Sequence, residues 1–394
     1  MNIFKRMMKE KLKDKFWSKT KNYFYMQRVE DSTLIQNINY DVVLDQPRVL
    51  MCYLTGGYFS NTDDNIGRTQ HSEIFKIVKI FSEFGYCIDL VYCNDIRSIQ
   101  ILSKKKYQII FGFGETFYQM VSRQPDAISI LYMTEHHPEF SFDEEKKRIE
   151  YYYARHGRHV SYLRSGRFYS IKHIEEKYSH LISMSEVEPF LKQYNTPFCI
   201  FPSGIINYEY RYKIKNHDKS RTNFLWLGSA GAVHKGLDLL IDIFSNRNDL
   251  TLHIAGLRKE EKKFLSIPKK GNIIDYGYIN IQSKTFLNLI DLCSFIILPS
   301  CSEACSTSIT TGMLHGLIPI VMKNAGFNRL KGHTIFLDDF KISYIDSMLS
   351  KVASMTKNEL DIFSRNVYSF AHDNFTISNF EQSFRGIISS IINK

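Results

Sequence analysis

Strand-like and helix-like segments alternate along most of this chain, and this alternation restricts its possible folds. Short apolar runs typical of buried strands occur in two series, and each run is followed by a helix-like or glycine-rich segment. The runs lie at residues 48–54, 87–92, 107–111, 128–133, 180–184 and 198–201, and then at 223–227, 250–255, 272–276, 295–298 and 318–321. Strands that alternate with helices favour parallel sheets with helices on both faces. We therefore expect an α/β fold with two doubly wound domains and a cleft between them.

A polar stretch at residues 207–222, rich in Lys, Arg and Asn, separates the two series and is typical of a linker. We expect an N-terminal extension at residues 1–44, a first domain at 45–205 and a second domain at 206–373. Residues 374–394 carry apolar side chains at helical spacing and predict a C-terminal helix.

The composition is typical of a globular chain. Its 394 residues are 44% hydrophobic, which is enough for two or three packed domains. None of the apolar runs reaches the roughly 18 residues of a membrane span, and the N-terminus lacks the apolar core of a signal peptide. The seven cysteines include no Cys-x-x-Cys pair and no His partner at metal spacing. We interpret them as reduced thiols of a cytoplasmic protein that has no metal site.

Most of the positive charge lies at the N-terminus. The formal net charge is +10, and residues 1–28 hold nine Lys or Arg against two acidic residues, which is +7. Phe4, Met8, Leu12 and Phe16 recur every fourth residue with lysines between them, as in a basic amphipathic helix. Such a helix can bind an anionic membrane surface, here the inner face of the cell membrane. The alternatives are packing on this protein or on a partner subunit, and nucleic-acid binding, for which we find no motif.

Residues 298–321 combine a strand, a loop of small residues, a short helix and a second strand. The loop at residues 300–308 contains seven Ser, Thr or Cys residues and one carboxylate, Glu303. Small side chains let backbone N–H groups reach an anion, and a helix that begins near Thr307 would direct its positive end at the same place. This pattern favours a phosphate and sugar pocket over an ordinary loop with a solvated glutamate.

A second glycine-rich loop follows the predicted strand at residues 223–227. Gly228 and Ser229 begin this loop, and Lys235 stands near its end, before an apolar helix. Glycine lets a substrate approach the backbone, and Lys235 is a mobile point charge suited to a diphosphate. Because the helix dipole disfavours a cation at a helix start, we favour a functional role over a solvated turn lysine.

These two segments resemble the donor-site signature of nucleotide-sugar glycosyltransferases of family 4, which have two Rossmann-like domains in the GT-B arrangement. The positions that match are Pro299, Ser300, Glu303, Met313, Gly316, Pro319 and Val321, together with Lys235 and Gly236 in the other loop. Two positions differ from the family pattern. Thr311 stands where the family has a second Glu, and Ser229 or Ala230 stands where it has an Arg.

The resemblance implies specific roles for residues of the second half. Glu303 would accept hydrogen bonds from donor-sugar hydroxyls, and Thr311 would offer one hydroxyl to the ribose. The diphosphate would be held by Lys235 and by the backbone amides of Ala304, Cys305, Ser306 and Thr307. The backbone at Tyr278 and Ile279 would contact the base, and Arg258 would replace the missing loop Arg if geometry allows. The C-terminal helix would return to the first domain, as is common in that family.

The N-terminal half contains two candidate loops at predicted strand ends, where ligands of open α/β sheets bind. Gly56 and Gly57 form the first loop. The second, residues 134–138, contains His136 and His137, either of which can orient or deprotonate an acceptor hydroxyl near neutral pH. Similar family members have a His there, which favours His136. The alternative is a pair of surface histidines before a proline turn.

Residues 151–173 form a basic and aromatic patch. They contain five Arg or Lys, three His, six aromatic rings and no acid. Arg155, Arg158 and Arg164 are the candidate ligands of an anionic acceptor, because arginine forks bind phosphates and rings stack on sugars. A nucleic-acid strand or a buried subunit interface would also explain this composition.

We therefore expect a retaining glycosyltransferase that uses a nucleotide diphosphate sugar, without a required metal ion, and a glycan or lipid-linked acceptor. The expected catalytic residues are Glu303, Lys235 and His136. Two alternatives remain open: a catalytically weak sugar-nucleotide-binding or scaffold subunit, which the differences at Thr311 and Ser229 favour, and a sugar-nucleotide epimerase of the same fold. The donor sugar, the base, the acceptor and the oligomeric state are left open.

Overall fold

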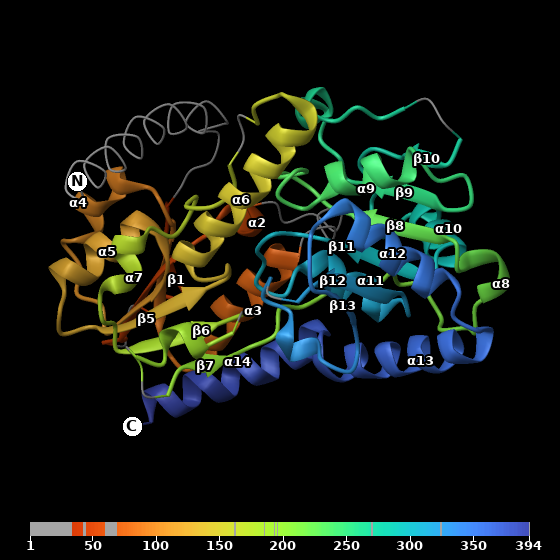
Figure 1. The fold of residues 1–394 in the computed structure, drawn as a ribbon. Helices are drawn as coiled ribbons and strands as arrows, with labels where there is room; N and C mark the ends of the chain where they lie inside the picture. Colours follow the sequence, from red (N-terminus) through yellow and green to blue (C-terminus); the bar gives the residue numbers. More distant parts are fainter. Residues whose placement is uncertain are drawn as a thin grey trace, which may run out of the picture.

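The computed structural model describes residues 34–41, 45–59, 69–160, 163–184, 186–192, 194, 196–268, 271–323 and 325–393. The amphipathic helix predicted at residues 1–28 lies outside them. Two sheets form the centres of two α/β units that lie side by side (Figure 1). The prediction of two Rossmann-like α/β units is confirmed. In the described part of the chain, no helix combines the length and apolar character that a membrane crossing requires.

The first unit contains a seven-stranded sheet with the order β1-β3-β2-β4-β5-β6-β7. Its strands are β1 (Leu34–Ile38), β2 (Arg48–Tyr53), β3 (Cys87–Tyr92), β4 (Ile109–Gly112), β5 (Ile128–Met133), β6 (His180–Ser183) and β7 (Phe198–Cys199). Its helical segments are α2 (Gly56–Phe59), α3 (Thr69–Glu83), η2 (Ile96–Ser98), α4 (Ile99–Leu102), α5 (Gly114–Arg123), α6 (Pro138–His156), α7 (Ile171–Glu175) and η3 (Glu188–Phe190). All neighbouring strands are parallel except β1, which pairs antiparallel with β3 and was not predicted.

The second unit contains a six-stranded parallel sheet with the order β10-β9-β8-β11-β12-β13. Its strands are β8 (Asn223–Leu227), β9 (Thr251–Ala255), β10 (Ile273–Asp275), β11 (Phe295–Leu298), β12 (Ile318–Met322) and β13 (Ile335–Leu337). Its helical segments are α8 (His217–Ser220), α9 (Leu237–Phe244), η4 (Lys259–Phe264), α10 (Lys284–Leu292), α11 (Thr307–Leu314), η5 (Asn328–Leu330), α12 (Ile342–Ala353) and α13 (Lys357–Asn374). The last strand, β13, was not predicted.

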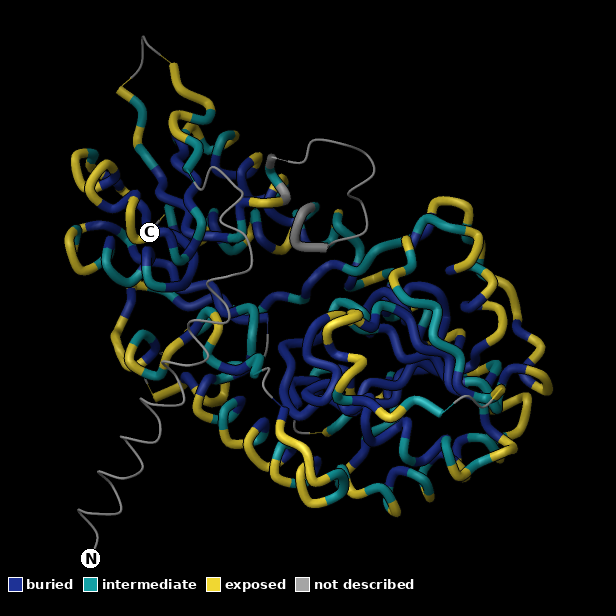
Figure 2. The backbone as a smooth tube through the Cα atoms, turned by 90° about the horizontal axis from the view of Figure 1, so that it is seen from above, coloured by how far each residue is buried: buried dark blue, intermediate teal, exposed yellow. Residues whose placement is uncertain are grey.

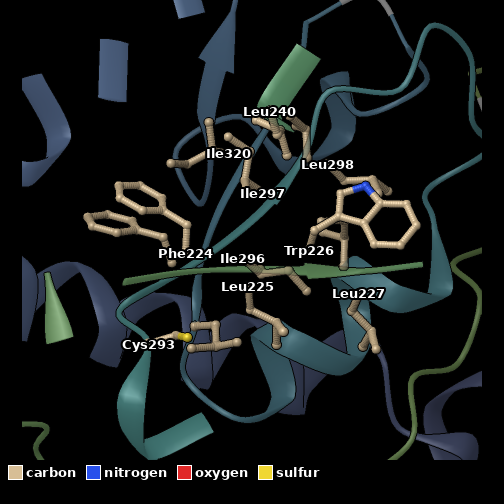
Figure 3. Packing of buried hydrophobic residues seen from close by; sticks show 14 of the residues in the cluster. Phe224, Leu225, Trp226, Leu227, Leu240, Cys293, Ile296, Ile297, Leu298 and Ile320 are labelled. Carbon is tan, nitrogen blue, oxygen red and sulfur yellow. The ribbon is translucent and has the colours of Figure 1, made fainter. Parts of the chain in front are cut away.

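Each sheet is buried on both faces, which explains why its strands are continuous apolar runs. In β8, Phe224 and Trp226 lie on one side of the sheet and Leu225 and Leu227 on the other (Figure 3). The central strands are dark along most of their length in the burial view (Figure 2), and the helices expose their outer faces. The C-terminal ends of the strands are therefore held in place by packing, and the loops that follow them start from fixed positions.

The chain crosses between the units more than once. The last helix, α14 (Ile377–Ile392), follows α13 along the same side of the molecule and returns to the first unit (Figure 1). There Phe384 packs against Phe81 of α3 and Phe111 of β4, with ring centroids 6.2 and 5.6 Å apart. The segment between β7 and α8 also crosses between the units. Its Gly204 amide donates to the carbonyl of Phe375, which lies between α13 and α14, so the two crossing segments are hydrogen-bonded to each other.

The long helix α6 also reaches across. It begins after β5 in the first unit, and its buried residues Ser141, Glu145, Arg148 and Tyr152 recur every third or fourth position, which places them on one face. Hydrogen bonds join this face to the loops of the second unit, for example from Arg148 to the carbonyl of Pro299 at 2.9 Å. The region between the two sheets is therefore built from both units.

Candidate functional site

A buried ion pair joins the loops that follow β8 and β11. Nζ of Lys235 lies 2.5 Å from Oε1 of Glu303, and their side chains are 5% and 4% exposed. The hydroxyl of Ser300 donates to the same carboxylate oxygen at 2.9 Å. Because β8 and β11 are adjacent parallel strands, the loops after them meet at one edge of the sheet. The structure thus brings together two residues predicted from separate motifs, with Lys235 buried and paired instead of mobile.

Both members of this pair are surrounded by further charges. Burial alone would raise the pKa of Glu303, but Lys235, Arg164 and His234 outweigh it and hold this pKa at about 2. Burial and the neighbouring Arg164 lower the pKa of Lys235, and Glu303 opposes them. Glu303 is therefore an ionised, acceptor-only group at neutral pH, suited to hydrogen bonds from hydroxyls.

The predicted diphosphate-binding amides lie at the N-terminal end of α11. Among the described residues, the amides of Ala304, Cys305, Ser306 and Thr307 donate to no protein acceptor. Ser306, the N-cap, makes no side-chain cap, because its hydroxyl pairs with that of Ser308 at 2.9 Å. Cys305 has a φ of +57°, a left-handed conformation that is uncommon for a side chain of this kind. These amides and the helix dipole are therefore available to an anion.

His234, which precedes Lys235, links the glycine-rich loop to α6. Its Nδ1 lies 2.9 Å from Oε1 of Glu145, and its Nε2 lies 2.8 Å from the carbonyl oxygen of Ser302. Since both partners are acceptors, both ring nitrogens carry a hydrogen, and the ring is an imidazolium. Burial would lower the pKa of His234, but the Cys301 sulfur and the Glu145 carboxylate raise it to about 10.

Glu145 on α6 also anchors the segment that contains Arg164. Its two carboxylate oxygens accept from the backbone amides of Arg164 and Ser165 at 2.8 and 2.9 Å. Nη2 of Arg164 then lies 3.8 Å from Oε2 of Glu303. Arg164, predicted as an acceptor ligand, is thus beside the predicted donor-site carboxylate. Sequence reasoning missed Glu145, because it is one of several acids in a helix and has no local motif.

The two predicted histidines of the 134–138 loop are not part of the cluster of charges formed by Lys235, Glu303, His234, Glu145 and Arg164. The ring of His136 is buried against Phe140, and burial lowers its pKa to about 4. His137 packs on Phe190 and lines an open cavity of about 570 Å³. Glu135 of the same loop interacts electrostatically with the cluster. Burial raises the pKa of Glu135, and the charges of Arg164 and His234 oppose the rise. Glu135 belongs to the predicted loop, but it was not among the predicted site residues.

The glycines of the loop after β8 are required by protein packing. A Cβ on Gly228 would lie 2.1 Å from the ring of Trp226, and a Cβ on Gly236 would lie 2.5 Å from the carbonyl oxygen of Pro299. Gly236 also has a φ of +68°, and Arg148 lies 2.9 Å from its Cβ position. At these two positions the backbone approaches other parts of the protein, whereas the sequence had suggested approach by a substrate.

A carboxylate of the second unit occupies other amides of the same loop. Oε1 of Glu261 accepts from the amides of Gly231 and Ala232 at 2.8 and 3.0 Å. Arg258, considered as a replacement for the missing loop Arg, is exposed at the N-cap of η4. Ser229 is exposed at the loop start. Glu261 was missed because it belongs to a charged surface-like run.

Thr311, the position of the absent second carboxylate, faces the segment that connects the units. Its hydroxyl accepts from the amide of Ile205 at 3.1 Å, and the side chain is buried. A Cβ on Gly204 would lie only 3.0 Å from the Thr311 amide nitrogen. The hydroxyl expected to contact a ribose therefore has a protein partner.

The other predicted ligands lie in different surroundings. Arg155 is ion-paired with Asp238 and Asp242 of α9, so its guanidinium joins α6 to the second unit. Arg158 is exposed. These arginines and Arg164 therefore do not form one acceptor patch.

The predicted base contact lies after β10. Tyr278 is 75% exposed there, and Ile279 packs partly on the core. Gly56 and Gly57 begin α2, directly after the C-terminal end of β2. In the part of the chain that the structure describes, no group of three or more His, Cys, Asp or Glu side chains is arranged to hold a metal ion.

No protein-family model matches this chain, and no curated protein matches it. Solved structures do. Sucrose-phosphate synthase from Thermosynechococcus elongatus aligns with a TM-score of 0.60 at 10% identity, over 88% of this chain and 99% of that one. HepE from Anabaena, in complex with UDP and glucose, aligns with a TM-score of 0.57 at 12% identity, over 87% and 100%. A glycosyltransferase from Rickettsia africae aligns with a TM-score of 0.56 at 12% identity, over 89% and 99%.

These alignments span both units of the chain and nearly the whole of each matching protein. In this chain the aligned region contains the two Rossmann-like sheets. The chain has the GT-B glycosyltransferase fold.

Proposed function

We propose that this chain is a glycosyltransferase that moves a sugar from a nucleotide diphosphate sugar to a glycan or lipid-linked acceptor, with retention at the anomeric carbon. One observation carries the proposal: the buried pair of Lys235 and Glu303 lies at the strand ends that also present the uncapped amides of residues 304–307. An ionised acceptor next to a cation and unpaired N–H groups suits the two ends of such a donor, its hydroxyls and its diphosphate.

In the proposed complex, Glu303 accepts from hydroxyls of the transferred sugar. Lys235 and the amides at residues 304–307 bind the diphosphate. The exposed ring of Tyr278 and the backbone at Ile279 lie at the same edge of the second sheet and receive the base. His136 remains the proposed acceptor-side base on the sequence resemblance alone, because burial lowers its pKa to about 4 and makes its ring a weak base at neutral pH.

Catalysis in this proposal is mainly electrostatic. Negative charge grows on the diphosphate as its bond to the sugar breaks, and preorganised donors stabilise it, each by about 3 kcal/mol. Lys235 and the helix amides supply these donors, so we propose that no metal ion is required. As the sequence resemblance implies, the acceptor attacks from the face that the diphosphate leaves, and no side chain acts as a nucleophile.

A second candidate is a sugar-nucleotide-binding scaffold with little activity. The hydrogen bond from Ile205 to Thr311 favours it, because the hydroxyl that would contact the ribose is already engaged. Calorimetry with UDP and GDP sugars, followed by transfer and hydrolysis assays, separates the two candidates. Binding without turnover supports the scaffold, and donor isomerisation without an acceptor reveals an epimerase.

The direct test is Lys235→Ala. With the donor identified by that screen, we expect turnover to fall about 100- to 1,000-fold, because one preorganised charge on the leaving group is lost. Lys213→Ala is the matched control, since Lys213 makes an exposed ion pair with Asp291 on the surface. Thermal unfolding checks that both variants are folded. If Lys235→Ala turns over as fast as the unaltered protein, the assignment of this site is wrong.

A further inference from the structure

The proposed diphosphate site needs more positive charge than the loops of the second unit provide. A nucleoside diphosphate carries two or more negative charges, and Lys235 is already paired with the ionised Glu303. Ser229 offers no charge, and Arg258 is exposed at the start of η4. The two amides of the glycine-rich loop at positions 231 and 232 are taken by Glu261. A second cation must therefore come from elsewhere.

Arg164 of the first unit lies where such a cation is needed. Its Cδ is 3.6 Å from the Cβ position of Gly231, so the side chain extends over the glycine-rich loop. Its Nη2 is 3.8 Å from Oε2 of Glu303, which is an ion-pair distance but too long for a hydrogen bond. The side chain is 28% exposed, so a ligand can reach it. The guanidinium thus lies between the loop and the carboxylate.

The segment that carries Arg164 is anchored through its backbone and through Ser165. Its backbone amide donates to Glu145, and Glu145 contacts the imidazolium of His234 in the second unit. The hydroxyl of Ser165 donates to the carbonyl of Ser141 at 2.9 Å, which holds the same segment on α6. The side chain can therefore be changed while the segment that carries it keeps its anchors.

We propose that Arg164 binds the diphosphate of the donor, and so supplies from the first unit the second cation that the glycine-rich loop lacks. This inference rests on the proposed function. A guanidinium fits a phosphate in a bidentate way that a lysine does not, so Arg164 complements Lys235. Because Arg164 and Lys235 belong to different units, tight binding of the donor requires the two units to be docked as they are in this structure.

Calorimetry with UDP, UMP, GDP and GMP tests this role. We expect Arg164→Ala to weaken binding of the preferred diphosphate about 10- to 100-fold, the loss expected for one hydrogen bond to a charged group. Binding of the monophosphate with the same base should be weakened less. Arg164→Lys should recover part of the affinity. Arg123→Ala is the control, since Arg123 is an exposed arginine of the first unit on α5. This variant should bind the diphosphate as tightly as the unaltered protein does.

The possible failures are distinguishable. If the unaltered protein binds neither diphosphate, the proposed function is wrong and this inference falls with it. If it binds and turns over the donor while Arg164→Ala binds the diphosphate equally well, only the role of Arg164 is overturned. A higher KM for the acceptor with an unchanged diphosphate affinity would instead assign Arg164 to the acceptor. If thermal unfolding shows that Arg164→Ala is not folded, Arg164→Gln gives the same comparison with a side chain of similar length.

Discussion

The two units contribute to the candidate site in different ways. The second unit supplies Lys235 and Glu303 from loops at the ends of adjacent strands, where a parallel sheet places ligands. The first unit supplies Glu145 and Arg164 from the middle of a long helix and from the segment after it. Strand-end loops can be recognised from short motifs, whereas a helix face that crosses to another unit depends on how the units pack.

This difference teaches that the site is a product of docking as well as of local structure. The imidazolium of His234 and the carboxylate of Glu145 form a buried contact between the units at 2.9 Å. Arg148 donates across the same boundary to Pro299. The loops of the second unit therefore depend on the first unit for their charge balance.

The largest expected effect comes from the first unit's contribution. Glu145→Ala leaves the buried imidazolium of His234 without its counter-ion and the amides of Arg164 and Ser165 without acceptors. Breaking a buried pair in this way should lower the free energy of unfolding by about 3–5 kcal/mol. Urea unfolding measures the loss.

Glu144→Ala is the control on the same helix, because Glu144 pairs with the exposed Lys147. We expect it to cost less than about 1 kcal/mol. If both variants lose the same stability, α6 contributes only helix structure, and the contact between the units carries no special weight.

A smaller effect is expected from the backbone of the second unit's loop. Gly236→Ala places a Cβ against Pro299 and Arg148 at a positive φ, and we expect a loss of about 2–4 kcal/mol from strain and overpacking together. Gly157→Ala has a similar φ of +62° at the end of α6, but its Cβ would have no neighbour within 4 Å. It should cost about 1 kcal/mol, the strain alone. Equal losses from chemical denaturation would show that the close approach at Gly236 is unimportant.

The smallest effect, measured across a single pH unit, is the pH dependence of the contact between the units. The pKa of His234 is raised to about 10 in the folded protein, above its ordinary value of 6.5. The folded state therefore binds one more proton than the unfolded chain between these values. The stabilisation is complete below pH 6.5 and is lost as the pH rises through about 10, by at most about 1.4 kcal/mol per pH unit.

Unfolding of the protein and of His234→Gln at pH 7 and pH 8 tests this. The unaltered protein should lose more stability between the two pH values than the variant does. Glu303 has the opposite sign, because its folded pKa of about 2 lies below its ordinary value, so its contribution is lost only in acid. Parallel changes in the two proteins would mean that His234 is not an imidazolium in the folded state.

The sheet strands were largely predictable, because a strand buried on both faces is a continuous apolar run. The six apolar runs of the first series and the five of the second correspond to β2–β7 and β8–β12. The two missed strands lie at sheet edges. β1 has two exposed residues and β13 is three residues long, so neither carries a strong apolar signal.

The candidate site was predictable only in part. Lys235 and Glu303 lie in loops with recognisable small residues, and the adjacent order of β8 and β11 brings them together. The surroundings of Thr311 and the glycines were not predictable. Their partners are Ile205, Trp226 and Pro299, and two of these three are far from them along the chain.

The sequence by itself determined the alternation of strands and helices, and the loops whose small residues surround a lysine and a glutamate. Periodicity and local composition carry this information, because they depend on neighbours a few residues away. Only the tertiary structure decided that Glu145 meets His234, 89 residues later in the chain, and that Arg164 lies over the glycine-rich loop. Contacts at such separations follow from how two rigid units pack, and no local pattern specifies that packing.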